Sequence, residues 1–408
     1  MNFKKILVLL ISMSFIIAIT SQLPIASATN GVTTDMKEWT FMVYLDADNN
    51  LDSAGVDDIL EMETVGSTSD VNIVVLFDRW FEECKFNGTA MLYIHKGYNE
   101  TIWGGWTNEY ELNMGDPKTL SWFINYVVEK YPAEKYALII WDHGGNWEGV
   151  CWDWTDNDYL TIPEVAEALS MANVKIDLLA FDACLMAGVE VAYEISLTGN
   201  VGILVASEDF VPWDGFPYDL ILADLVADPT MDARKLAVCT IDCYIEYYAT
   251  QDVNRVFVTL SAINLELLND LVSRIAALSM ELVENFGKYR DAITAAKDAA
   301  DRYWFGFWIQ GAYIDLHQFT EKLGNLKPDL RDLTKAILQE WRNVVIYAKC
   351  CKGPHILGGA GLTIYFPREA NHWYDIEAYR KNVPSFVEDT QWDKLLEIYF
   401  SWPEYLLS

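Results

Sequence analysis

Short apolar segments alternate with amphipathic segments of helical length through the first half of the chain. The apolar segments are residues 40–45, 71–77, 91–94, 136–141, 176–181 and 203–206. Helices are predicted between them at residues 51–65, 120–130, 162–171 and 189–196. Apolar strands that alternate with helices are typical of a parallel sheet covered by helices on both faces. The pattern therefore predicts an α/β fold.

The second half of the chain is richer in helices. Residues 265–300 carry apolar side chains at three- and four-residue spacing, as amphipathic helices do. Two strand-like segments remain, at residues 255–260 and 361–366, and we expect the second to return to the main sheet. No linker rich in Pro, Gly or Ser and no internal repeat divides the chain. The sequence therefore favours one α/β/α domain with a helical second half.

The amino terminus has the features of a secretory signal peptide. Lys4 and Lys5 precede an apolar run at residues 6–19, and Ala26-Ser27-Ala28 offers the small residues that a signal peptidase reads. The alternative is a retained membrane anchor, but the run is shorter than the roughly 20 residues of a spanning helix. No later segment is long and apolar enough to span a membrane, so we expect a secreted protein. The predicted division of the chain is a signal peptide at 1–28, a short polar segment at 29–38 and a folded domain at 39–408.

The chain is strongly acidic, with a formal net charge of −31 at pH 7. Such a surface repels phosphate backbones, and the sequence has no basic stripe, which argues against nucleic-acid binding. Acidity favours solubility and attracts cationic partners. We expect a monomer outside the cytoplasm.

The chain has seven cysteines, an odd number for an exported protein, so at least one thiol stays free. Cys239 and Cys243 lie one helical turn apart, and the adjacent Cys350 and Cys351 are closer than usual disulfide geometry prefers. None of the cysteine spacings is typical of a zinc site. An unpaired thiol in an exported chain is a candidate for a reactive residue.

Polar residues follow several of the predicted strands, at 46–50, 142–145, 182–184 and 207–209. In open parallel sheets, active sites form beyond the carboxyl ends of the strands. His143, one of only five histidines, follows one strand, and Cys184 follows the next. We therefore expect this imidazole and this thiol to share one edge of the sheet.

Such a pair can carry out nucleophilic catalysis. A thiolate is a strong nucleophile, and acyl transfer needs an acid/base group that protonates the leaving amine. Gly144 lets the backbone approach a substrate carbonyl and offer an N–H group to a developing oxyanion. The alternative is that His143 closes a loop and Cys184 is a small buried apolar residue. The presence of both residues on adjacent strand ends favours catalysis.

Several of these segments resemble those of clostripain-family cysteine peptidases. The similar segments are 48–51 (DNNL), 141–145 (WDHGG), 182–186 (DACLM), 205–208 (VASE), 214–218 (DGFPY) and 361–367 (GLTIYFP). The resemblance runs from about Trp39 to the carboxyl terminus, and the histidine and cysteine segments are its most specific part. It implies a caspase-like α/β/α sandwich with a mostly parallel sheet and a helix-rich second half.

The resemblance also implies roles for individual residues. Cys184 matches the family's nucleophile and His143 its acid/base, and the N–H groups of Gly144 and Cys184 match its oxyanion hole. Asp182 matches the acid that lines the S1 pocket and selects a basic P1 side chain. The alternative for Asp182 is a helix N-cap or a carboxylate at the sheet edge.

The substrates that this resemblance implies are peptides or proteins with Arg or Lys at P1, cleaved through a thioester acyl-enzyme. A second acid in the S1 pocket would be Asp209 or Asp214, and the sequence does not choose between them. Two other functions stay open. One is a non-catalytic secreted module that binds peptides on the same fold, and the other is a peptide ligase or transpeptidase in which an amine replaces water.

Residues 46–50 superficially suggest a calcium-binding loop. An EF-hand loop has Gly at its sixth position and Glu at its twelfth, where this chain has Leu51 and Asp57. The sequence therefore predicts no metal ligand and no cofactor. Some relatives in the family that this chain resembles depend on calcium, so an ion at another position stays open.

Two features depart from the family's pattern. Asn146 stands in the turn after His143, where relatives often have Gly or Ser, so the form of this turn is open. Some relatives mature by cutting themselves after a basic residue between the histidine and cysteine strands. Residues 144–173 contain no Lys or Arg, so we expect a single-chain enzyme.

Overall fold

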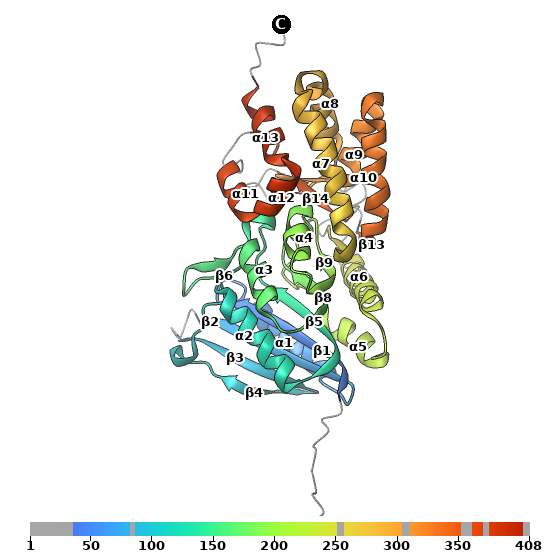
Figure 1. Ribbon diagram of the computed structural model, residues 1–408. Helices are drawn as coiled ribbons and strands as arrows, with labels where there is room; N and C mark the ends of the chain where they lie inside the picture. Colours follow the sequence, from blue (N-terminus) through green and yellow to red (C-terminus); the bar gives the residue numbers. More distant parts are fainter. Residues whose placement is uncertain are drawn as a thin grey trace, which may run out of the picture. The chain divides into compact units, whose positions relative to one another are not determined.

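The apolar segments of the first half form the centre of a large mixed sheet. The computed structural model describes residues 36–81, 86–250, 257–303, 311–351, 361–369 and 375–402. The predicted signal peptide and Cys84 lie outside these ranges. Among the described residues, nine strands pair in the order β13-β10-β9-β8-β5-β1-β2-β3-β4 (Figure 1). Their bounds are Lys37–Ala47 (β1), Val71–Phe81 (β2), Phe86–His95 (β3), Tyr98–Gly104 (β4), Ala133–Trp141 (β5), Ile176–Asp182 (β8), Val201–Ala206 (β9), Thr259–Asn264 (β10) and Val345–Cys350 (β13).

The middle of this sheet is parallel and its two ends are antiparallel. Strands β2, β1, β5, β8 and β9 pair in parallel, as the strand–helix alternation predicts. Strands β3 and β4 form an antiparallel hairpin at one end, and β10 and β13 pair antiparallel at the other. The sheet is therefore mostly parallel where the candidate site residues lie.

Strand β1 shows why the central strands form. From Trp39 to Ala47 every residue is buried, and successive side chains point to opposite faces of the sheet. Met42 and Tyr44 pack into the core on one face, and Phe41 and Val43 pack into the core on the other. A strand buried on both faces requires a continuous apolar run, which this segment supplies.

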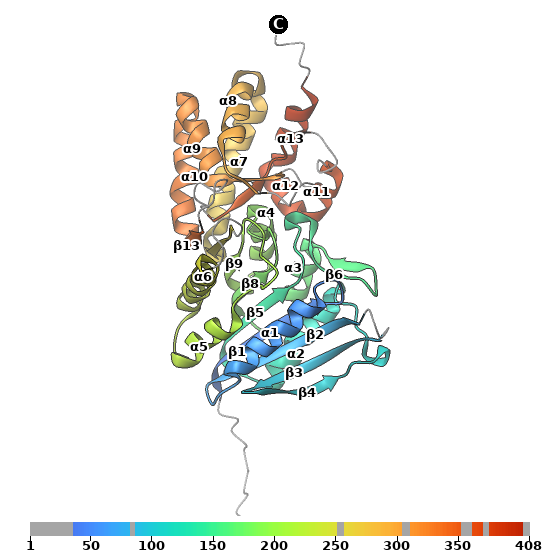
Figure 2. The ribbon, with the colours of Figure 1, turned by 180° about the vertical axis from the view of Figure 1, so that it is seen from behind.

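Helices cover both faces of the sheet, which confirms the predicted α/β/α arrangement. Figure 1 shows α2 in front of the sheet, and Figure 2 shows α1 on the opposite face. Apolar residues of α1, α5 and α6 join the core on one face, and those of α2, α3 and α4 join the core on the other. The bounds of these helices are Asp52–Val65 (α1), Pro117–Lys130 (α2), Ile162–Met171 (α3), Val189–Ser196 (α4), Tyr218–Ala227 (α5) and Ala233–Ala249 (α6).

The second half is helix-rich, as its apolar spacing predicts. In α7 the buried residues Leu268, Leu271, Ile275, Leu278 and Leu282 follow the three- to four-residue spacing of one helical face. This face joins the same core as α2, α3 and α4. The helices of this half are Leu268–Glu284 (α7), Phe286–Ala299 (α8), Leu316–Leu326 (α9), Arg331–Val344 (α10), Ile376–Asn382 (α11), Pro384–Thr390 (α12) and Trp392–Ser401 (α13).

Of the two predictions for the strands of the second half, one is wrong and the other is confirmed in part. The segment 361–366 does not return to the main sheet, because its strand β14 (Thr363–Tyr365) pairs with β12 (Tyr313–Asp315) in a separate sheet completed by β11 (Arg302–Tyr303). The strand expected at 255–260 overlaps β10, which begins at Thr259, and residues 255 and 256 lie outside the described residues. The segment 361–366 is too short for its apolar pattern to specify a partner strand.

The remaining elements are short. Strands β6 (Val150–Asp153) and β7 (Asp158–Leu160) form a hairpin beyond the end of β5. Single 3-10 turns occur at Asn108–Tyr110 (η1), Asn146–Glu148 (η2), Leu265–Leu267 (η3) and Pro328–Leu330 (η4). In the part of the chain that the structure describes, no helix combines the length and apolarity needed to cross a membrane.

Candidate active site

The carboxyl ends of β1, β5 and β8 lie side by side at one edge of the sheet. Leu45 of β1 is opposite Trp141 of β5, and Trp141 is opposite Asp182 of β8. Because the three strands are parallel neighbours, the segments that follow them emerge next to one another. The structure therefore brings together the three segments that contain Asn50, His143 and Cys184, as the sequence predicts for the last two.

The loops of His143 and Cys184 are in close backbone contact. A Cβ atom added to Gly144 would lie 2.3 Å from the carbonyl oxygen of Cys184 and 3.0 Å from its backbone nitrogen. Only a residue without a side chain can pack this closely against the neighbouring loop. The glycine after His143 is thus required by the approach of the two loops, and Gly144 and Cys184, the two residues of the predicted oxyanion hole, meet in this contact.

His143 is held by the loop that follows β1. Its Nε2 lies 3.0 Å from Oδ1 of Asn50. An amide oxygen can only accept, so this pairing keeps the imidazole proton on Nε2 and leaves Nδ1 able to take a proton. Burial lowers the pKa of His143, which favours the neutral ring that a general base requires.

The same loop is also fastened to the residue before His143. The side-chain amide of Asn49 donates to Asp142 Oδ1 at 2.8 Å and to the carbonyl oxygen of Trp152 at 3.1 Å. The other oxygen of Asp142 accepts from the backbone N–H of Trp152. Asp142 is buried, and these bonds hold the turn that presents His143.

Cys184 has a half-buried thiol at the end of β8. Its Sγ contacts the carbonyl oxygen of Val211 at 3.7 Å, and the backbone N–H of Leu185 donates to the backbone carbonyl oxygen of Asp209 at 3.0 Å. Burial raises the pKa of the Cys184 thiol to about 12. With the pKa of His143 lowered, the resting pair is neutral, so attack on a carbonyl requires transfer of the thiol proton to a base.

Asp182 lies at a cavity of about 320 Å³ that His143 and Cys184 also line. Its Oδ2 accepts from the backbone N–H of Phe216 and from the hydroxyl of Tyr218, both at 2.9 Å. Its Oδ1 is buried and has no hydrogen-bond partner among the described residues. Burial raises the pKa of this carboxyl to about 7. Asp182 is not a helix N-cap, since α4 begins only at Val189.

A second buried acid lies beneath the same cavity, on helix α1. The indole N–H of Trp141, which lines the cavity, donates to Asp58 Oδ2 at 2.7 Å. A Cβ atom on Gly215 would lie 3.0 Å from an oxygen of Asp182 and 3.4 Å from one of Asp58. Burial and the charge of Asp182 raise the pKa of Asp58 well above its usual value. The two carboxyls therefore give this cavity an acidic floor.

Asp209 and Asp214, the two alternatives for a second acid in the S1 pocket, lie elsewhere. Asp209 is buried beside the Cys184 loop, and Asp214 is exposed and accepts from the hydroxyl of Tyr247 at 3.2 Å. Among the described residues, neither is part of the cavity lining, which is Asn50, Leu51, Trp141, Asp142, His143, Asp182, Cys184, Phe210, Val211, Pro212, Trp213 and Gly215.

His143 also lines a second cavity, of about 330 Å³. It shares His143 and Phe210 with the first cavity, so the two are neighbours. Most of its lining is aromatic or apolar: Trp152, Trp154, Leu185, Phe210, Ala312, Tyr313 and Tyr365. Such a surface suits apolar side chains of a ligand that extends beyond the acidic cavity.

Asn146, which departs from the family's pattern, has a structural role. Its backbone is left-handed, with φ of 58°, a conformation that Asn tolerates better than most residues. Its side-chain amide donates to the carbonyl oxygen of Leu185 at 2.8 Å, and its Oδ1 accepts from the N–H of Trp147 at 2.8 Å. The turn after His143 is thus tied to the turn after Cys184.

Comparison with known proteins identifies the family. The model of the clostripain family of C11 peptidases matches residues 43–402. The chain belongs to the clostripain family. This clostripain-family chain is 28% identical to clostripain of Hathewaya histolytica over 397 residues, which cover 80% of this chain and 74% of that protein. It is a cysteine-type endopeptidase, and its substrates are peptides or proteins.

Solved structures of C11 proteases share the caspase-like fold of this clostripain-family chain. A secreted C11 cysteine protease from Bacteroides thetaiotaomicron, in complex with an irreversible peptide inhibitor, has a TM-score of 0.65 at 22% identity and covers 87% of this chain and 99% of its own. An inactive zymogen C11 protease from Parabacteroides distasonis has a TM-score of 0.62 at 21% identity and covers 88% of this chain and 98% of its own. These likenesses confirm the fold predicted from the sequence.

Sequence reasoning missed two residues of this site. Asn50 stands in a segment that the resemblance already included, and its place after β1 was the available signal. Asp58 lies within an ordinary amphipathic helix, and nothing in the sequence marks its contact with the cavity. Asn50 and Asp58 lie at the site only because of how the helices and strands of the chain pack against one another.

Proposed function

We propose that this protein is an exported endopeptidase that cleaves after Arg and Lys, with Cys184 as nucleophile and His143 as acid/base. The observation that carries the proposal is the buried carboxylate of Asp182 at the cavity that both catalytic candidates line. An oxygen without a partner on a buried carboxyl is costly, and a cationic side chain in the cavity would satisfy it.

The proposed reaction begins with attack of the Cys184 sulfur on the scissile carbonyl carbon. His143 takes the thiol proton on Nδ1, while Asn50 keeps the ring oriented through Nε2. The N–H groups of Gly144 and Cys184 stabilise the negative oxygen of the tetrahedral intermediate. His143 then gives the proton to the leaving amine, and the peptide bond breaks to leave a thioester on Cys184.

Hydrolysis of the thioester completes the cycle. His143 accepts a proton from water as the water attacks the thioester carbonyl. When the carbon–sulfur bond breaks, His143 returns this proton to the sulfur, which regenerates the thiol and releases the carboxylic acid product. Each of these steps uses only groups of the chain, water and the substrate.

Specificity is proposed to follow from the acidic floor of the cavity. A guanidinium or ammonium group bound there would donate to Asp182 Oδ1 and reduce the repulsion between Asp182 and Asp58. A neutral P1 side chain would leave both carboxyls without a counter-charge. Arg is expected to be at least as good as Lys, because its planar group can bind a carboxylate with two hydrogen bonds.

We expect Asp182→Asn to remove most of the preference for basic P1 residues. Loss of a buried charge pair that contributes about 3 kcal/mol corresponds to a factor of roughly 10² in kcat/KM for Arg and Lys substrates. The measurement is a P1 positional library, run on the wild type and the variant. Asp214→Asn is the matched control, since this exposed acid is outside the cavity lining and its loss should leave the profile unchanged.

Two outcomes would count against this pocket. A wild-type preference for Asp, Asn or large apolar P1 residues would contradict an acidic S1 site and leave the catalytic pair in place. If the Asp182→Asn variant kept the full preference for Arg and Lys at P1, another acid would have to determine this specificity.

The pH dependence provides a separate prediction. With its pKa raised to about 7, the Asp182 carboxyl loses its proton as pH rises through 7, so kcat/KM for an Arg substrate should rise across the same range. His143 has a lowered pKa and is already neutral there. In the Asp182→Asn variant, the rise of kcat/KM near pH 7 should disappear. Only the fall of kcat/KM that accompanies protonation of His143 should remain, below pH 6.5. An unchanged profile in the variant would contradict the assignment.

Export is proposed from the amino-terminal segment. Lys4 and Lys5, the apolar run and Ala26-Ser27-Ala28 fit a signal peptide that is removed after Ala28. The Bacteroides relative with the same fold is described as secreted, which supports the proposal.

A further inference from the structure

The proposed reaction leaves one of the two cavities at His143 without a role. This cavity, of about 330 Å³, has a mostly aromatic lining, and we call it the aromatic cavity. The cavity that Asp182 lines is the acidic cavity. His143 lines both cavities, but among the described residues Cys184 lines only the acidic one. This difference indicates which part of a bound peptide each cavity would hold.

The two catalytic candidates act on different sides of the scissile bond. In the proposed reaction the sulfur of Cys184 bonds to the carbonyl carbon of P1, and the imidazole of His143 gives its proton to the leaving amine of P1′. A cavity that both residues line therefore adjoins the P1 side chain. A cavity lined by His143 without Cys184 begins where the leaving amine lies, so it adjoins the P1′ side chain. This step rests on the proposed function.

The walls of the aromatic cavity are held by contacts within the fold. The hydroxyl of Tyr313, on β12, donates to the carbonyl oxygen of Gly145 at 2.9 Å. The ring of Trp152, on β6, stacks on Tyr159 with ring centroids 5.3 Å apart and planes 9° apart. Because these rings are fixed in the free protein, the cavity is already formed before a ligand enters it.

The rim of the aromatic cavity carries an exposed tryptophan. Trp154 is 50% exposed and packs edge-on against Trp80, with ring centroids 6.0 Å apart. Among the described residues, Trp154 and Trp213 are the two tryptophans with exposed side chains, and Trp213 lines the acidic cavity. An exposed aromatic ring that adjoins an apolar cavity is typical of a surface that a ligand covers.

One acid faces the aromatic cavity. Glu148 is the only carboxylate among the described lining residues, and this lining has no Lys or Arg. Burial and the charge of Asp375 raise the pKa of Glu148 to about 7. An acidic side chain of a ligand would meet this carboxyl without a counter-charge, and the repulsion between like charges would disfavour it.

We propose that the aromatic cavity is the S1′ subsite of this peptidase and binds a large apolar or aromatic side chain directly after the scissile bond. A Phe or Tyr ring at P1′ would pack against Trp152, Trp154 and Tyr313. Such aromatic contacts stabilise a complex beyond the burial of apolar surface alone. A Gly at P1′ would leave these rings uncovered. Substrates would thus be selected by a cation before the bond and an apolar group after it.

The test measures kcat/KM on internally quenched peptides that have Arg at P1 and each amino acid in turn at P2 or at P1′. With the wild type, Phe, Tyr and Leu at P1′ should each exceed Gly by at least about 10-fold, because hydrophobic cavities discriminate by about this factor. Peptides with Asp or Glu at P1′ should be cleaved more slowly than the Gly peptide. The P2 series should not show this order.

Variants of the lining connect the preference to single residues. Trp154→Ala should lower the ratio of kcat/KM for Phe to that for Gly by about 5-fold, through loss of one aromatic contact. Glu148→Gln, measured at pH 8 where Glu148 is ionised, should raise kcat/KM for Asp and Glu at P1′ by about 10-fold. The matched control is Tyr98→Ala, which removes an exposed aromatic residue of β4 outside both cavities and should keep the wild-type profile.

Three results would overturn the subsite. A flat P1′ series in an enzyme that selects Arg at P1 would contradict this inference and leave the proposed function in place. The same apolar preference at P2 would assign the cavity to the acyl side of the bond. An unchanged ratio of Phe to Gly in Trp154→Ala would mean that other residues determine the preference.

A binding measurement keeps this inference separate from the proposed function. If no peptide with Arg at P1 is cleaved, the proposed function fails, and binding to Cys184→Ala decides the subsite. Calorimetry with two peptides that differ only by Phe or Gly after Arg should give a Kd at least about 10-fold lower for the Phe peptide. Trp154→Ala in the same background should remove most of this difference. Equal Kd values for the two peptides would overturn the subsite.

Discussion

Replacement of Cys184 by alanine is expected to abolish peptide cleavage and to leave the fold intact. Loss of a catalytic nucleophile costs about 10⁶ in rate in other enzymes that use a nucleophile and histidine. Among the described residues that line the two cavities, Cys184 is the only cysteine, so this lining offers no second thiol. The half-buried Sγ makes one long contact with Val211, and its removal should change Tm little. Cleavage of a P1-Arg peptide and thermal unfolding measure the two effects.

A second thiol provides the control. Cys239→Ala removes a half-buried cysteine on α6, outside both cavities, and should keep wild-type activity. An Arg- or Lys-based acylating probe should label the wild type and the control at Cys184 and leave Cys184→Ala unlabelled. Full activity in Cys184→Ala would falsify the assignment of the nucleophile, and cleavage would then require a different residue.

The central strands could be predicted because they lie in the core, with apolar residues packed against both of their faces. Strands β1, β5 and β8 are buried on both faces, so each requires an unbroken apolar run that is visible in the sequence. The predicted meeting of His143 and Cys184 follows from this alone, since parallel neighbours end at the same edge.

The edges of the fold could not be predicted in the same way. Strand β4 is exposed along most of its length and has little apolar pattern, so it was not predicted at all. Strand β14 has a clear apolar pattern, but its three residues fit any sheet with an open edge. Its partner β12 is equally short. For such segments the packing of the helical second half decides the pairing.

The acidic residues of this chain do not all lie on the surface. The net charge of −31 suggests a solvated surface, yet several carboxyls are buried at the end of the sheet, among them Asp46, Asp58, Asp142 and Asp182. Buried acids are costly unless they are paired, protonated or bound to a cation. The S1 site that we propose uses such acids to bind positive charge.

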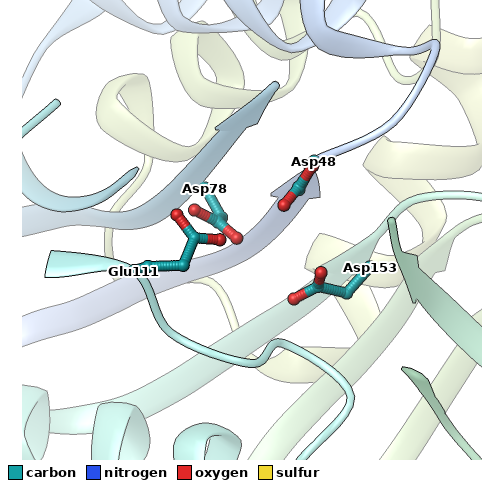
Figure 3. Close-up of side chains that lie close together, drawn as sticks. All are labelled: Asp48, Asp78, Glu111 and Asp153. Atoms are coloured by element: carbon teal, nitrogen blue, oxygen red, sulfur yellow. The ribbon is translucent and has the colours of Figure 1, made fainter. Parts of the chain in front are cut away.

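Some groups of side chains cannot be predicted from local sequence. Asp48, Asp78, Glu111 and Asp153 come from the segment after β1, from β2, from the segment after η1 and from β6. One carboxylate oxygen of each lies within 4.8 Å of the others (Figure 3). Only the arrangement of these elements brings the four side chains together.

Replacement of His143 by alanine is expected to remove turnover at every pH, with a loss of at least about 10⁴ in kcat. Because the pKa of Cys184 is raised to about 12, almost no thiolate forms near neutral pH without a base. Higher pH should restore little, since the leaving amine still needs a proton donor. His317→Ala is the control, because this half-buried histidine packs on Trp341 and does not line either cavity.

Comparison of an amide with an activated ester would separate the two tasks of His143. A nitrophenolate leaves without protonation, so His143→Ala should lose less activity on the ester than on the amide, whereas Asn50→Ala should reduce both by a similar and smaller factor. That difference arises because Asn50 only orients the ring through Nε2, and the imidazole of the variant can still transfer the proton. If His143→Ala raised KM and left kcat unchanged, the imidazole would bind substrate only, and the acid/base role would have to pass to another group at the cavity.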